Sequence, residues 1–205
     1  MRGLRRKTGS PAAGTADLPR LGWAVNRHGQ DLIVSVIPSR VAGENSFRPV
    51  DVFPGADDGE RQGAAASELV ASLSRAAEAP GTVAIQGFAA RSPDGRGLTF
   101  TLAVSLADIP YPEAGELPEG DVSECRLACG PAVRIFRLTE PGDPESNSPI
   151  AMFSTTYLAQ TDYGVLALAF ATPHVDGARE FAVLFESIAS TCTIQPAPPA
   201  GSTAT

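Results

Sequence analysis

Long apolar runs are absent from this 205-residue sequence, and cysteine is scarce. No stretch of eighteen apolar residues occurs, so the sequence predicts no membrane-spanning helix. The three cysteines, Cys125, Cys129 and Cys192, are an odd number and too few for a disulfide scaffold. The basic amino terminus lacks the apolar stretch that a secretory signal peptide needs. These absences predict a cytoplasmic protein with free thiols and no membrane insertion.

Common catalytic and nucleotide-binding motifs are also missing. The sequence has no Gly-x-Ser-x-Gly elbow, no Walker phosphate loop and no His-Glu-x-x-His motif. Gly95 and Gly97 suit a hairpin turn, because no helix follows them to complete a phosphate cradle. The acidic segment 113–124 lacks the spacing of an EF-hand and is interpreted as a solvated loop. The sequence therefore predicts no cofactor, no metal and no enzymatic activity.

Charge is unevenly distributed along the chain. The net charge is −7, yet residues 1–20 carry five basic side chains and one acidic side chain. An acidic body of this kind argues against nucleic-acid binding. The polar composition of residues 1–20 and the proline-rich composition of 195–205 predict a disordered arm and a disordered tail. Residues 21–194 are left as a single folded domain.

Alternation of apolar and small or polar residues predicts a series of antiparallel strands. The clearest run is 98–106, where every second residue is apolar over nine positions. Short turn-forming segments connect most of the strands and favour hairpins. The predicted strands are 22–25, 31–37, 47–53, 83–90, 98–106, 122–128, 132–138, 150–159 and 163–171.

Two segments instead show apolar residues three or four positions apart, which is typical of helices. The first is 58–79, where the stripe is rich in alanine; the second is 176–190, with Asp176 as its expected N-cap. The stripe of the second helix consists of Ala178, Phe181, Leu184, Phe185 and Ile188. Helices and antiparallel strands together predict an α+β fold, an antiparallel sheet of about six to eight strands flanked by helices.

The final third of the chain resembles a known family. The segment Tyr163–Pro173, with Ala178, Phe181, Phe185, Ile188 and Ala189 after it, is similar to the closing hairpin and helix of PsbP-like domains. Gly130-Pro131-Ala132-Val133-Arg134 is similar to a strand entry in the small actinobacterial proteins that share this ending. The resemblance covers 123–194 and implies an α/β/α sandwich with accessory or interaction roles. It rests on packing residues and implies no active site.

The two histidines and the three cysteines are the remaining candidates for chemistry. His28 falls in a predicted turn, where a solvated role is expected. His174 lies two residues before Asp176, but no cluster supplies the further ligands that a metal needs. Cys125 and Cys129 would lie about 13 Å apart on an extended strand, too far for a disulfide, unless the chain kinks near Gly130-Pro131. Buried, unreactive thiols are the favoured interpretation.

Three functions are therefore open at this point. The favoured hypothesis is a non-enzymatic interaction domain with a protein partner. The alternative is a small-ligand-binding domain with a cleft between sheet and helix, lined by Phe100, Phe153, Tyr157 and Phe170. The third is a hydrolase that uses Cys192 or His174.

Overall fold

Antiparallel strands dominate the part of the chain that the structure describes. The structure is a computed structural model, and it describes residues 20–37, 48–50, 81–91, 97–113, 117, 119–142 and 150–198. Its strands are β1 (Leu21–Arg27), β2 (Gln30–Val36), β3 (Arg48–Val50), β4 (Thr82–Arg91), β5 (Gly97–Ala107), β6 (Asp121–Leu127), β7 (Gly130–Thr139), β8 (Met152–Thr161), β9 (Gly164–Thr172) and β10 (Thr193–Pro196). The helices are a 3₁₀ turn, η3 (Val175–Gly177), and α2 (Ala178–Ser190).

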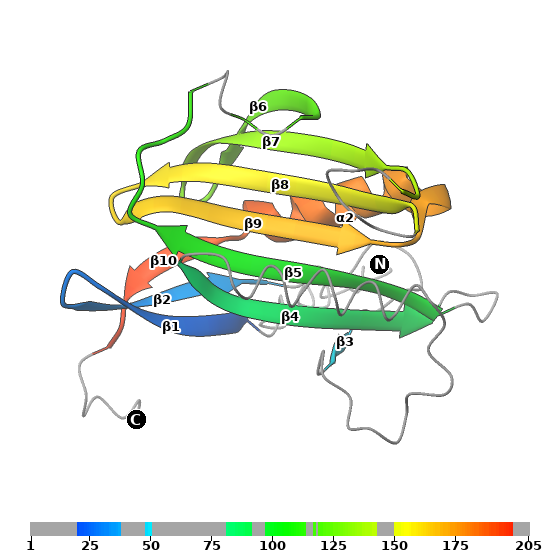
Figure 1. The fold of residues 1–205 in the computed structure, drawn as a ribbon. Coiled ribbons are helices and arrows are strands. Elements are labelled where there is room, and N and C mark those ends of the chain that lie inside the picture. The colour runs from blue at the N-terminus through cyan, green and yellow to red at the C-terminus, as the bar shows by residue number, and fades with distance from the viewer. Residues whose placement is uncertain are drawn as a thin grey trace, which may run out of the picture.

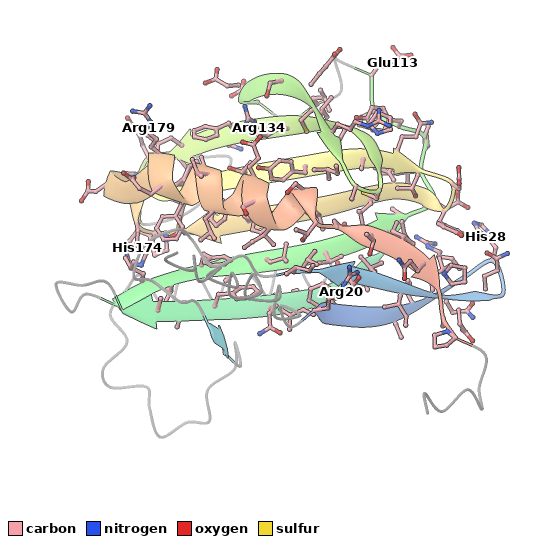
Figure 2. All side chains as sticks on the ribbon, turned by 180° about the vertical axis from the view of Figure 1, so that it is seen from behind. Arg20, His28, Glu113, Arg134, His174 and Arg179 are labelled. Atoms are coloured by element: carbon pink, nitrogen blue, oxygen red, sulfur yellow. The ribbon has the colours of Figure 1, made fainter. Side chains whose placement is uncertain are left out.

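The strands form two sheets (Figure 1). The larger sheet has seven strands in the order β3-β4-β5-β9-β8-β7-β6, and the smaller has three in the order β1-β2-β10. Figure 2 shows α2 and the three-stranded sheet side by side on one face of the seven-stranded sheet. This face is called the helix face below. The predicted antiparallel sheet accompanied by a helix is thus confirmed, but the described strands form two sheets instead of the single sheet expected.

Alternation along the central strands decides which residues point to the helix face. In β5, Phe100, Leu102, Val104 and Leu106 are all fully buried, and their partners in β9 include Leu168 and Phe170. The three-stranded sheet adds Leu32, Val34 and Val36 from β2 to the same cluster. One continuous hydrophobic core therefore joins both sheets and α2.

Two-residue turns set the register of the hairpins. The turn between β1 and β2 places His28 and Gly29 at φ values of 48° and 78°, the left-handed conformation that such turns require. Leu127 pairs with Gly130 across the β6–β7 turn, and Ala128 and Cys129 form the turn itself. The sequence predicted this junction at Gly130-Pro131, which instead begins β7.

The helix ends and the last strand differ from expectation. Asp176 is not the N-cap of α2: it lies within η3, Gly177 occupies the cap position, and no side chain caps the helix. Residues 195 and 196 were expected in a disordered tail, but they belong to β10 and pair with Ile33 and Leu32 of β2. The predicted helix 58–79, most of the arm 1–20 and the turn 92–96 lie outside the described residues.

Candidate functional site

The four aromatic residues predicted to line a ligand cleft form part of the packed core. Phe100, Phe153, Tyr157 and Phe170 are at most 1% exposed. Phe185 of α2 packs among them, with ring centroids 4.7 Å from Phe170, 5.2 Å from Phe100 and 5.8 Å from Phe153. These side chains are thus buried between the sheet and α2, and none of them lines either of the two hollows described below. The sequence correctly groups them on one face but does not reveal that α2 fills the space.

His174 has a packing role at the start of the helical segment. Its Nε2 accepts a hydrogen bond of 3.0 Å from the backbone N–H of Thr99, and its ring stacks on Phe181 at 5.9 Å. The second histidine, His28, faces Asp108 at 3.4 Å on the surface, where both side chains are about two-thirds exposed.

The geometry rules out a nucleophile dyad of Cys192 and His174. His174 precedes η3 (Figure 2), whereas Cys192 follows Thr191, the C-cap of α2. The 13 residues of α2 alone separate them by about 20 Å, given about 1.5 Å of rise per residue. In the described ranges, no three His, Cys, Asp or Glu side chains are grouped so that they could hold a metal ion.

A polar cluster lies instead between α2 and the β6–β7–β8 end of the helix face. Arg134 of β7 forms an ion pair of 3.1 Å with Glu186 of α2, and its Nε donates a 3.2 Å hydrogen bond to Ser123. Tyr157 is buried beside them, and burial raises the pKa of its hydroxyl, with the negative charge of Glu186 as a further cause. The hydroxyl of Tyr157 therefore stays protonated at neutral pH.

The three thiols gather at the same end of the sheet. Cys129 in the β6–β7 turn and Cys192 after α2 are hydrogen-bonded through their side chains. Cys125 of β6 is partly buried and interacts electrostatically with Cys129. Burial raises the pKa of Cys125, whereas the hydrogen bond from Cys192 lowers the pKa of Cys129. All three cysteines are unbridged in the structure.

Surface hollows accompany the same hairpin. One, of about 220 Å³, is lined by Tyr111, Glu124, Cys125, Pro131, Ala132, Val133 and Gln160. Another, of about 300 Å³, is lined by Glu119, Gly120, Asp121, Phe136, Arg137 and Leu138. Both volumes are at or below the lower end of the range for small-molecule sites, about 300 Å³.

The outer edge of β6 is a further feature of this region. Among the described strands, β6 pairs only with β7 and ends the seven-stranded sheet. Val122 of β6 is 47% exposed, and Leu138 near the same end of β7 is 60% exposed. An edge strand with apolar neighbours of this kind can pair with a strand of another chain.

The register of the hairpin shows which backbone groups face outward. Arg126 pairs with Pro131, which has no N–H, so this pair cannot be one that exchanges ladder hydrogen bonds. Because the two kinds of pair alternate, Val122, Glu124 and Arg126 direct their backbone N–H and C=O groups away from β7. Three residues of β6 thus offer hydrogen-bonding groups to the outside.

Sequence reasoning predicted the two strands of this hairpin, but it missed the open edge of β6 and the backbone groups that face outward from it. Only Pro131 gave a signal for the outward groups, and that signal requires the register to be known.

No family model, curated protein or solved structure matches the chain. In the described part of the chain, no helix is long and apolar enough to cross a membrane.

Proposed function

We propose that this protein is a non-enzymatic, cytoplasmic interaction domain that binds an extended segment of a partner protein along the outer edge of β6. The observation that carries this proposal is the row of outward-facing backbone groups at Val122, Glu124 and Arg126. An added strand forms main-chain hydrogen bonds with such a row, and these supply affinity without any specific side chain.

Side chains along the hairpin supply selectivity. Val122 gives an apolar contact for a partner side chain, while Glu124 and Arg126, two residues apart on the same face, present opposite charges. The partner segment that fits is extended and amphipathic, with an apolar residue opposite Val122 and a basic residue opposite Glu124.

The resemblance of 123–194 to PsbP-like domains supports an accessory role. The α/β/α sandwich that it implies remains a proposal, as does the relation to actinobacterial proteins. The histidines give no support to a hydrolase, because His174 accepts a backbone hydrogen bond and lies at the opposite end of α2 from Cys192.

The test is site-specific photo-crosslinking in the native cell. A photoreactive amino acid at position 122 is expected to give a defined adduct with one protein. The substitution Glu124→Pro removes an outward N–H but no β6–β7 ladder bond, so it should abolish the adduct. The matched control Glu124→Gln keeps the N–H and should retain it.

Two results would count against the proposal. Equal adduct yields from the Pro and Gln variants would show that strand pairing at β6 is not the mode of binding. The absence of any protein adduct, together with a rise in melting temperature on addition of a small metabolite, would favour the ligand-binding alternative.

A further inference from the structure

Two cysteines far apart in the sequence meet where the β6–β7 turn contacts the end of α2. Cys129 is the second residue of the turn, and Cys192 lies between the C-cap of α2, Thr191, and the first residue of β10. The backbone N–H of Cys192 donates a 2.9 Å hydrogen bond to Ala189, which holds the residue against the helix end. The two thiols are in direct hydrogen-bonded contact.

The environments of the two thiols differ in the way that a nucleophile and a resolving thiol require. Cys129 is partly exposed in the turn, whereas Cys192 is 0% exposed within the core. The hydrogen bond from Cys192 lowers the pKa of Cys129 and favours its thiolate. The same hydrogen bond, followed by burial, raises the pKa of Cys192, which therefore carries the proton.

We propose that Cys129 and Cys192 are a redox modification site that forms a reversible intramolecular disulfide with low-molecular-weight disulfides as the oxidant. The contact between the two thiols supplies the proximity that a disulfide needs, and Cys129 lies in a turn instead of within a strand of the ladder.

The reaction proceeds by two thiol–disulfide exchanges. The Cys129 thiolate attacks one sulfur of an oxidised disulfide such as glutathione disulfide, forming a mixed disulfide and releasing one thiolate. The released thiolate takes the proton of Cys192. The Cys192 thiolate then attacks the Cys129 sulfur and expels the second glutathione as a thiolate, which is protonated by solvent. Two protein thiols are oxidised, and one glutathione disulfide is reduced to two thiols.

The product links parts of both sheets. The β6–β7 turn belongs to the end of the seven-stranded sheet, and Cys192 leads directly into β10 of the three-stranded sheet. The bridge closes a loop of 62 intervening residues, and such a crosslink stabilises a fold chiefly by restricting the unfolded chain. Oxidation should therefore raise the melting temperature, and reduction should reverse the rise.

The test compares the purified full chain before and after incubation with oxidised glutathione at neutral pH. In the wild type, two of the three thiols should become inaccessible to iodoacetamide after denaturation, and peptide mapping should join the peptides that contain Cys129 and Cys192. The control Cys125→Ala should give the same bridge. The variant Cys129→Ser should give no bridge and no oxidant-dependent change in melting temperature.

Three outcomes would overturn the proposal. One is a bridge between Cys125 and Cys129 in the wild type. Another is a stable glutathione adduct on Cys129 beside a free Cys192. The last is a wild-type protein that keeps all three thiols reduced. The peptide map of the wild type decides among them without any variant, so a failure of Cys129→Ser to fold leaves the test intact.

Discussion

Three chemically identical side chains in this protein have different acidities because their surroundings differ. Burial disfavours the charged thiolate of Cys125, while Cys192 donates a hydrogen bond that favours the thiolate of Cys129. Cys192 itself is held as a thiol in the core. The contact between the β6–β7 turn and the end of α2 is thus the largest cause of the opposite pKa shifts of Cys129 and Cys192.

We expect the alkylation of Cys129 under native, reducing conditions to rise with pH through a lower midpoint than that of Cys125. The reason is that a lowered pKa, as at Cys129, gives more thiolate at a given pH, whereas a raised pKa, as at Cys125, gives less. Iodoacetamide labelling between about pH 6 and pH 9, followed by peptide mass spectrometry, measures both residues in one sample. A lower midpoint for Cys125 would contradict the assignment.

Much of this residue-level detail could not be predicted from the sequence. The alternation in β5 and β9 indicated that Phe100 and Phe170 face one way, and the structure confirms it. What lies opposite them depends on where α2 packs, which periodicity does not specify. Cys129 and Cys192 are in contact because α2 runs back across the sheet to the β6–β7 end. The spacing of the cysteines along the chain therefore does not predict this contact.

At the scale of the elements, α2 packs into the core chiefly through one side chain, Phe185. Phe185 is fully buried and contacts Phe100, Phe153, Phe170 and Phe181. The ring therefore joins α2 to the central strands β5, β8 and β9.

The substitution Phe185→Ala should lower the free energy of unfolding by about 3–5 kcal/mol, because it removes a large buried ring and leaves a cavity. Val183 lies on the same helix but is 63% exposed, so Val183→Ala should change it by less than about 0.5 kcal/mol. Urea denaturation of both variants measures the difference. Similar losses in the two would show that α2 does not pack in the orientation described.

The sequence predicts the long strands well and the ends of elements poorly, for physical reasons. A strand such as β5 repeats the same pattern over many residues, so the signal accumulates. β10 has four residues, includes Pro196 and is stabilised by pairing with β2, more than 150 residues earlier in the chain. Asp176 had the right residue type for a cap, but the 3₁₀ turn η3 moves the start of α2 past it.

At the scale of the whole molecule, both sheets and α2 share one core. Side chains from β2, β5 and α2 belong to the same buried cluster, with Trp23 of β1 packed against it. A shared core makes separate unfolding of the smaller sheet unfavourable, since its loss would expose the inner residues of the larger one.

We therefore expect a single cooperative unfolding transition. Trp23 is the sole tryptophan and reports on the three-stranded sheet, whereas far-ultraviolet circular dichroism is dominated by the larger sheet. Urea titrations followed by the two signals should coincide. A tryptophan transition at clearly lower urea would show that the three-stranded sheet unfolds independently, and would separate the molecule into two cooperative units.

The pairing of β2 with β10 also determines when the smaller sheet can fold during protein synthesis. Ser35 and Thr193 are hydrogen-bonded at 3.0 Å although 158 positions separate them, so the ribosome makes one partner long before the other. Throughout that interval the apolar side chains of β2 lack the strand that completes their sheet, a situation that exposes nascent chains to aggregation. The three-stranded sheet can therefore be completed only after the chain has been synthesised to about residue 196.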